Sequence, residues 1–210
     1  MPSRAPAAEA PKGRAKLRKA ATRQDLTRTP RAALTRCAWA DTDPELAAYH
    51  DTVWGERPAS DDAYFERMML EVFHAGLNWK LVWNKRDGIR AAFRDFNIRK
   101  LANLTPREID GLLADPRIIR NRKKIEATVT NARTILDLQD EHGSFAAFLN
   151  ALPAGEGPKL AVLKRTFKFL GPGVGRSFLH AAGLEPAPHH PYCFKAAGAT
   201  ARGAKAGAGR

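Results

Sequence analysis

The apolar residues between about position 60 and position 182 recur with the spacing of α-helices, and the alternation typical of strands is nearly absent. The clearest helix begins at Ser60-Asp61-Asp62, a polar start signal. Its apolar positions are Tyr64, Phe65, Met68, Met69 and Val72. Gly76 is expected to break or bend this helix, and a second helix follows with Leu81, Val82, Ile89 and Phe93. The pattern predicts an all-α fold.

Further helix boundaries carry their own signals. Thr105-Pro106-Arg107-Glu108 places threonine at the cap, proline at the first helical position and glutamate three residues after the cap. Asp115-Pro116 predicts a turn after this helix. The remaining predicted elements are a long helix from Ile118 to about Leu138, a short helix that Ser144 caps and that runs to about Leu152, and a Pro/Gly loop at 153–158.

The chain of 210 residues fits one compact domain, at 37–194, between two basic tails. The net charge is +13, of which residues 1–36 contribute +8 and residues 195–210 contribute +4. Both ends are rich in Ala, Gly, Pro, Lys and Arg, so we expect them to be disordered. Such tails can hold nucleic acid through its phosphates, but they can equally be solubility tails without a partner.

Composition also excludes several classes of protein. No apolar run approaches the ~20 residues of a membrane helix, and the N-terminus has no apolar h-region of a secretory signal. Two cysteines exclude a disulfide framework and a four-cysteine iron–sulfur cluster. We therefore expect a cytoplasmic protein.

Each cysteine has a histidine close by, at opposite ends of the patterned region: Cys37 with His50, and His189 with Cys193. Two thiolates and two imidazoles make a complete tetrahedral set for a structural zinc ion. The gap after Cys37 is not a standard zinc-finger spacing, so the alternative of inert buried cysteines stays open at this point.

A glycine-rich segment interrupts the helical pattern near the end of the domain. Gly171, Gly173 and Gly175 precede Arg176 and an apolar helix, and this arrangement resembles the helix–hairpin–helix element of DNA repair glycosylases. Small glycines allow close approach, and the helix N-terminus attracts a phosphate. An ordinary helix–loop–helix connection is the alternative.

The same region indicates which chemistry is missing. Glycosylases of this superfamily that also cut the DNA backbone carry a lysine just after the hairpin, where this chain has Arg176 and Ser177. The usual downstream catalytic aspartate is absent as well, since no aspartate follows Asp140. Lyase activity is therefore not expected.

Glu71 is the only acidic residue in the apolar stretch 68–79. A carboxylate in such a stretch is expected to be functional or to form a pair, here with Arg67 one turn earlier. The aromatic residues nearby in the sequence are Trp39, Tyr49, Trp54, Trp79 and Trp83. Together they suggest a pocket for a flat, electron-poor ring, with an ordinary hydrophobic core as the alternative.

Several blocks of the chain resemble bacterial 3-methyladenine DNA glycosylase I. They occur in order as CAW (37–39), AYHD (48–51), WG (54–55), LE (70–71), AGLNW (75–79), IIRNRK (118–123) and FKFLG (167–171). The resemblance covers about 37–193. It implies a zinc-clasped helical glycosylase that acts as a monomer on double-stranded DNA.

The resemblance also implies roles for single residues. The zinc ligands fall on Cys37, His50, His189 and Cys193, and His190 is a competing candidate that does not keep the His-x-x-x-Cys spacing. The base-recognition glutamate falls on Glu71, and the pocket tyrosine on Tyr49. Trp79 takes the stacking position, and Trp39 and Trp54 match other pocket aromatics.

The expected activity is excision of 3-methyladenine by base flipping and hydrolysis of the N-glycosidic bond, which leaves an abasic site. Two residues depart from the family pattern: Val72 stands where a small residue is expected, and Asn78 stands in place of a common serine. These departures leave two alternatives open. One is an inactive zinc-containing DNA-binding relative, and the other is a glycosylase for a different lesion.

Overall fold

A computed structural model describes residues 35–196, and these residues form helices joined by short loops. The helices are α1 (Pro44–Thr52), α2 (Asp61–His74), α3 (Trp79–Asn84), α4 (Arg86–Ala92), a 3-10 helix η2 (Arg94–Phe96), α5 (Ile98–Ala102), α6 (Pro106–Ala114), α7 (Arg122–His142), α8 (Phe145–Asn150), α9 (Glu156–Thr166) and α10 (Pro172–Ala181). No strand occurs within the described range, so the predicted all-α fold is confirmed.

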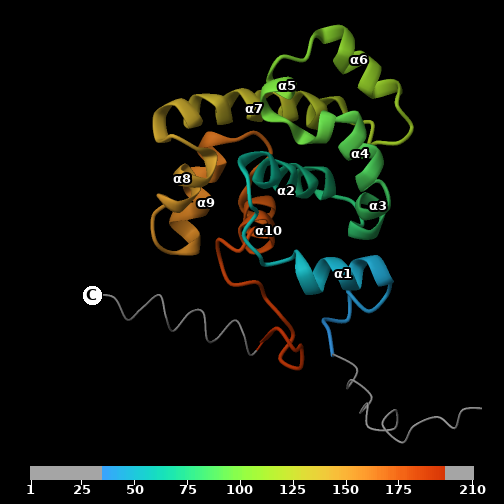
Figure 1. Cartoon of the computed structure of the whole chain (residues 1–210), viewed down its shortest axis with the longest axis vertical. Helices are drawn as coiled ribbons and strands as arrows, with labels where there is room; N and C mark the ends of the chain where they lie inside the picture. The colour runs from blue at the N-terminus through green and yellow to red at the C-terminus, as the bar shows by residue number, and fades with distance from the viewer. Residues whose placement is uncertain (1–34, 197–210) are drawn as a thin grey trace, which may run out of the picture. The chain divides into compact units, whose positions relative to one another are not determined.

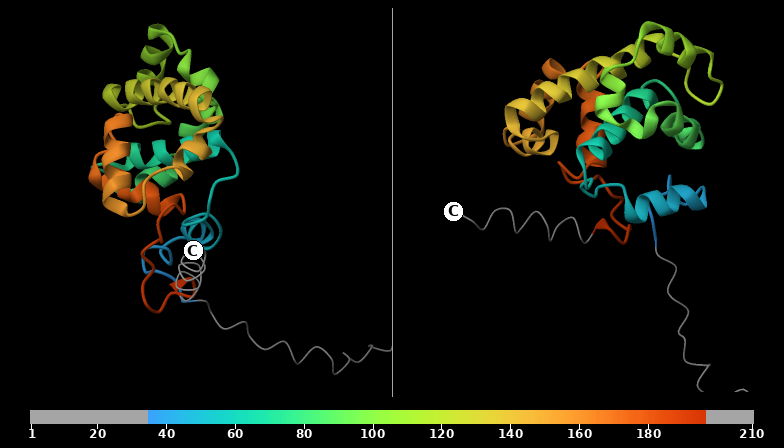
Figure 2. Two further views of the ribbon diagram at one scale, coloured as in Figure 1. Left: turned by 90° about the vertical axis from the view of Figure 1, so that its left-hand side faces the viewer. Right: turned by 45° about the horizontal axis from the view of Figure 1, so that its top comes forward.

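Helix α2 is the centre of this domain. It packs against α7 on one side and α10 on the other (Figure 1), and α5 and α8 also contact it. Its side chains Phe65, Met68, Met69 and Phe73 are fully buried in the main core. The view from the side shows the same order of α7, α2 and α10 (Figure 2). Glu71, which lies on this buried part of α2, is therefore placed where water is scarce.

The start of α2 explains both its own position and that of two other helices. The Ser60 side chain accepts a hydrogen bond from the Ala63 N–H, as expected for an N-cap. Asp61 accepts from the N–H groups of Phe145 and Ala146 at the start of α8. Asp62 accepts from the Ile98 N–H at the start of α5 (3.0 Å). These two carboxylates satisfy otherwise unpaired N–H groups of distant helices.

Two predicted helices differ from the observed ones. The second predicted helix is divided at Lys85 into α3 and α4, and this turn allows both Val82 and Ile89 to reach the core. The long helix α7 begins at Arg122, because the Asn121 side chain caps it, and Ile118 lies in the preceding loop although it is buried.

The ends of the later helices also differ. Helix α7 runs beyond the predicted end at Leu138 to His142, where Gly143 adopts the left-handed conformation (φ 83°) that commonly ends a helix. Helix α8 is capped by Ser144 as predicted, but it ends at Asn150. Part of the predicted loop at 153–158 is helical, since α9 begins at Glu156.

Most of the two predicted tails lies outside the described residues. Arg36 and Lys195, which were assigned to the tails, make specific contacts: Arg36 binds Asp51, and the Lys195 ammonium donates to the carbonyl oxygens of His50 and Trp54. The folded part therefore includes these two positions. Within the described range, no helix is long and apolar enough to span a membrane.

Candidate active site and metal centre

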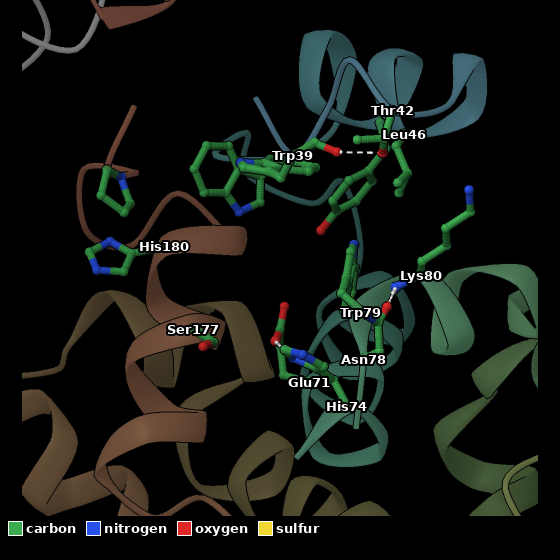
Figure 3. Close-up of a pocket in the computed structure, with 13 residues that line it drawn as sticks. Trp39, Thr42, Leu46, Glu71, His74, Asn78, Trp79, Lys80, Ser177 and His180 are labelled. Atoms are coloured by element: carbon green, nitrogen blue, oxygen red, sulfur yellow. Dashed lines mark hydrogen bonds and ion pairs between the residues drawn. The ribbon is translucent and has the colours of Figure 1, made fainter. Parts of the chain in front are cut away.

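A pocket of about 570 Å³ opens between α10 and the aromatic residues of the first half of the domain. Helix α10 forms one wall with Ser177 and His180, and α2 and α3 form the facing wall with Glu71 and Trp79 (Figure 3). The full lining consists of Trp39, Thr42, Leu46, Tyr49, Trp54, Glu71, His74, Asn78, Trp79, Lys80, Ser177, His180 and Pro188. All five residues predicted to bind the base therefore line one cavity.

Glu71 is buried, with 7% of its surface exposed, and its carboxylate faces the pocket (Figure 3). Its neighbour is His74, whose Nδ1 lies 3.5 Å from Oε2 of Glu71. The alternative pairing with Arg67 is wrong, because that guanidinium donates to the backbone carbonyls of Val53 and Ala181. The Glu71 carboxylate thus keeps acceptor capacity for a ligand in the pocket.

Tyr49 comes from α1 and is held by the tryptophans around it. Its ring centroid lies 4.4 Å from that of Trp83 and 5.8 Å from that of Trp79. Burial raises the pKa of the Tyr49 phenol, and the nearby negative charge of Glu71 raises it further. The phenol therefore keeps its proton at neutral pH and can donate a hydrogen bond.

Trp39 and Trp54 form the remaining aromatic wall, with an edge-to-face contact of 5.2 Å between ring centroids. Across the pocket, His74 meets Trp79 edge to face at 5.1 Å. Offset and edge-to-face contacts of this kind fix ring orientations and leave ring faces available for stacking. The geometry suits a flat heterocyclic ligand.

Sequence reasoning missed several lining residues, above all Ser177 and His180 of α10. His180 Nε2 lies 3.7 Å from Glu156, and its buried Nδ1 has no hydrogen-bond partner. Ser177 directly follows the predicted hairpin, but His180 belongs to no recognisable motif. Both residues are about 100 positions away from Glu71, so only the packing of α10 on α2 brings them to the pocket.

The four predicted metal ligands also meet. Cys37, His50, His189 and Cys193 each offer a ligand atom, and these atoms lie within 4.8 Å of one another. Sγ of Cys193 is 3.4 Å from Nε2 of His50 and 3.6 Å from Nδ1 of His189. Tetrahedral zinc with typical Zn–S and Zn–N bonds requires sulfur–nitrogen separations of about 3.6 Å. The cluster fits a metal ion.

His190, the competing candidate, has another role in the structure. Its backbone N–H donates to Sγ of Cys37 (3.3 Å), and its ring lies beside Tyr192. Burial and the neighbouring His50 lower the pKa of His189 to about 4. A neutral imidazole is the form that binds metal.

A chain of contacts orients His50 within the cluster. Nδ1 of His50 lies 3.0 Å from Asp51, whose carboxylate accepts hydrogen bonds from two nitrogens of the Arg36 guanidinium, Nε and Nη2. These hydrogen bonds hold the pKa of Asp51 below its usual value, so the carboxylate stays charged and accepts from Nδ1. Such outer contacts fix the His50 tautomer with its proton on Nδ1, so that Nε2 can bind a metal ion.

The cluster adjoins the aromatic wall of the pocket. The ring of His50 lies 5.4 Å from that of Trp39, and the ring of His189 lies 4.7 Å from that of Trp54. Two of the four residues of the cluster therefore contact pocket residues directly.

The predicted hairpin lies between α9 and α10. Gly171 is the N-cap of α10, but Gly173 and Gly175 lie inside the helix rather than in the loop. A Cβ at Gly175 would meet the side chain of Leu160 at 2.9 Å, so this glycine serves the packing of α9 on α10. Arg176, predicted to bind phosphate, is half exposed and pairs with Glu156.

The chain is similar to solved structures of 3-methyladenine DNA glycosylase I. It aligns with a solved structure of 3-methyladenine DNA glycosylase I at 33% identity and a TM-score of 0.69, over 76% of this chain and 98% of the other. A tyrosine-to-phenylalanine variant of 3-methyladenine DNA glycosylase I, solved with 3-methyladenine, is 35% identical with a TM-score of 0.68, and 76% of this chain and 96% of that one are covered.

The class is thus that of the all-helical DNA glycosylases. The sequence pattern of the methyladenine glycosylase family matches residues 39–161. DNA-3-methyladenine glycosylase 1 of Escherichia coli is 34% identical over 171 residues, which cover 72% of this chain and 91% of the relative. The chain belongs to the methyladenine glycosylase family.

Proposed function

We propose that this protein is a monofunctional DNA glycosylase that excises 3-methyladenine from alkylated double-stranded DNA. The observation that carries the proposal is a buried carboxylate, Glu71, at the wall of an aromatic pocket. The pocket volume of about 570 Å³ is sufficient for one flipped purine and part of its sugar. We further propose that the protein acts on its DNA substrate as a monomer and in the cytoplasm.

In this reaction the damaged nucleotide leaves the duplex and its base enters the pocket. Trp79 stacks on the base, and Glu71 accepts a hydrogen bond from its amino edge, a contact of roughly 1.5–3 kcal/mol for a charged acceptor. Tyr49, whose raised pKa keeps it protonated, donates to a ring nitrogen. Water then bonds to the sugar carbon as the glycosidic bond breaks. The cationic base leaves as neutral 3-methyladenine with the electron pair of that bond, and the water gives up one proton to solvent, which leaves an abasic site.

Lyase activity is not part of the proposal. A lyase requires an amine nucleophile next to the hairpin, and α10 offers Arg176 and Ser177 there. The pocket lysine, Lys80, lies on α3 at 3.8 Å from Asp43. The product strand is therefore expected to remain intact until it is treated with alkali.

We also infer that the Cys/His cluster holds one structural Zn²⁺ ion. Two thiolates and two imidazoles fill all four positions of a tetrahedral ion, which leaves no open position for substrate. Its contribution would be to hold the two ends of the domain together.

Glu71→Gln tests the proposed function. The variant should fold normally but release 3-methyladenine from methylated DNA roughly 10- to 100-fold more slowly, because the charged acceptor is lost. Chromatography of the released bases measures this rate. Glu66→Gln on the same helix, where Glu66 pairs with Arg90 outside the pocket, is the matched control and should behave as wild type.

The same assay separates the alternatives. An inactive DNA-binding relative would release no base, and a glycosylase for another lesion would release a different one. Unchanged release by the Glu71→Gln protein would remove Glu71 from base recognition.

A further inference from the structure

Helix α7 carries a buried polar stripe that the proposed mechanism does not use. Lys124, Thr128 and Asn131 lie at intervals of four and three residues, so they share one face of the helix. All three are buried, with exposures of 6%, 0% and 0%. Buried polar groups are costly unless they are hydrogen-bonded, so their partners indicate what the stripe holds in place.

Lys124 holds the end of the helix that bears Glu71. Its ammonium donates to the carbonyl oxygens of Phe73 (2.9 Å) and Ala75 (2.7 Å). Phe73 belongs to the last turn of α2, and Ala75 is its C-cap. The next residue, Gly76, adopts a left-handed conformation (φ 77°). Carbonyls at a helix C-terminus lack partners within the helix and favour a positive charge.

The position of this contact matters for the pocket. Glu71 and His74 lie on the final turn of α2, and three residues after Ala75 the chain reaches Asn78, the cap of α3, and then Trp79. Burial lowers the pKa of Lys124, and the carbonyl oxygens of Phe73 and Ala75 replace part of the hydration that the ammonium loses. Lys124 therefore fixes the segment between the proposed base acceptor and the proposed stacking residue.

Asn131 holds the hairpin in an equivalent way. Its side-chain oxygen accepts from the Lys168 N–H (2.8 Å), and its amide nitrogen donates to the Lys168 carbonyl (3.1 Å). The next residue, Phe169, adopts a left-handed conformation (φ 63°) that side chains rarely take. Such a conformation persists only where surrounding contacts determine it, and the two Asn131 bonds supply these contacts.

Thr128 lies between them and contacts neither element through its hydroxyl. The hydroxyl donates to the Lys124 carbonyl of its own helix (2.9 Å). The stripe thus contains two residues that bind other elements and one that does not.

We propose that Lys124 and Asn131 are positioning residues that hold two segments at a fixed spacing on α7: the connection between α2 and α3, and the loop between α9 and α10 that leads into the hairpin. This inference rests on the proposed glycosylase function. The two residues are seven positions apart, about 10 Å along the helix axis. A phosphate bound at the hairpin would then lie at a fixed distance from the pocket. Lys124 should therefore affect binding of the base, whereas Asn131 should affect binding of the DNA.

Three variants with side chains of similar size separate these steps: Lys124→Met, Asn131→Leu and Thr128→Val. Two measurements are made on each, the affinity for free 3-methyladenine from tryptophan fluorescence, and kcat and KM for excision from a methylated duplex. Melting temperatures establish that each variant is folded. If Lys124→Met does not fold, Lys124→Gln is used in its place, and if Asn131→Leu does not fold, Asn131→Asp is used.

Lys124→Met should weaken binding of the free base about tenfold and lower kcat, since small displacements of site residues have effects of this size. Asn131→Leu should leave free-base binding within about twofold of wild type but raise KM for the duplex about tenfold, because the hairpin meets DNA only. Thr128→Val should change neither measurement. A further variant, Lys124→Arg, keeps the positive charge and should bind the free base as tightly as wild type does.

Equal effects of Lys124→Met and Asn131→Leu on both measurements, or changes that only follow the melting temperature, would overturn the inference. Such an outcome with an active wild type leaves the proposed function intact. A wild type that releases no 3-methyladenine would instead contradict the proposed function. Free-base binding would then test Lys124, and affinity for the duplex would test Asn131.

Discussion

At the scale of single residues, the pocket pairs a charged acceptor with a protonated donor. Glu71 and Tyr49 come from different helices, and the charge of Glu71 is one cause of the raised pKa of Tyr49. Burial is the larger cause. The same burial that packs Tyr49 against Trp83 therefore keeps its phenol in the form that donates.

Tyr49→Phe should retain this packing and lose only the donor. We expect affinity for free 3-methyladenine to fall about fivefold, the effect of one neutral hydrogen bond of about 1 kcal/mol. Calorimetric titration with the free base measures the change. Tyr64→Phe is the control, because Tyr64 is equally buried but packs against Phe145 away from the pocket. Equal affinities of the Tyr49→Phe and wild-type proteins would show that the phenol does not contact the base.

The raised pKa of Tyr49 also has a consequence for stability. A group with a higher pKa in the folded state contributes fully below its unfolded pKa of about 10, and this contribution is lost as the pH rises further. Unfolding by denaturant should therefore become easier above about pH 10 in wild type, and less so in Tyr49→Phe.

At the scale of secondary structure, α10 connects the hairpin to the pocket. Its N-terminal turn contains Gly173, and its second and third turns supply Ser177 and His180 to the cavity. Because Arg176 pairs with Glu156, the backbone of the first turn is the stronger candidate for phosphate binding.

Gly173→Ala tests that candidate. A Cβ at this position meets nothing within 4 Å, so alanine should raise stability by about 0.4–1 kcal/mol through the unfolded state. If DNA approaches the backbone here, affinity for the duplex should nevertheless fall, as gel-shift titration would detect. Gly111→Ala in α6 is equally unobstructed and should leave DNA affinity unchanged. A Gly173→Ala protein with wild-type DNA affinity would exclude close approach at this turn.

Local signals explain why so much of the helical fold could be predicted from the sequence. The Thr105–Glu108 capping box is present, and the hydrogen bond from the Thr105 backbone is the main reason that the pKa of Glu108 falls to about 2. Ser60 and Ser144 cap their helices as expected. Each of these signals lies within a few residues of the boundary that it sets.

The features that could not be predicted depend on contacts between distant segments. Asp61 caps α8 from 84 residues away, and His180 reaches a pocket whose other wall is about 100 residues earlier. Ile118 is apolar and buried as a helix position would be, yet it lies in a loop. Hydrophobic spacing records burial, but it does not specify which element a residue is buried against.

At the scale of the whole domain, the Cys/His cluster joins the two ends of the described chain. Cys37 and His50 come from its beginning, and His189 and Cys193 from its end. The Phe194 N–H also donates to the Thr35 carbonyl (2.9 Å), so backbone pairing accompanies the cluster. Closing a long chain in this way restricts the unfolded state.

Removal of the metal should consequently affect both stability and the pocket. Cys193→Ser should lose the one zinc ion per chain that we infer, which elemental analysis measures, and structural zinc can contribute on the order of 10 kcal/mol. Because Trp39 and Trp54 rest on His50 and His189, the same variant should bind free 3-methyladenine more weakly even below its melting temperature.

The neighbouring histidines provide the control for this assignment. His190→Ala should keep the metal, since the contact of His190 with Cys37 is made by its backbone N–H, whereas His189→Ala should lose it. The reverse result would transfer the ligand role to His190. Loss of zinc with unchanged base affinity would show that the cluster stabilises the fold without shaping the pocket. Loss of both together would mean that the domain's closure and its base recognition depend on the same four side chains.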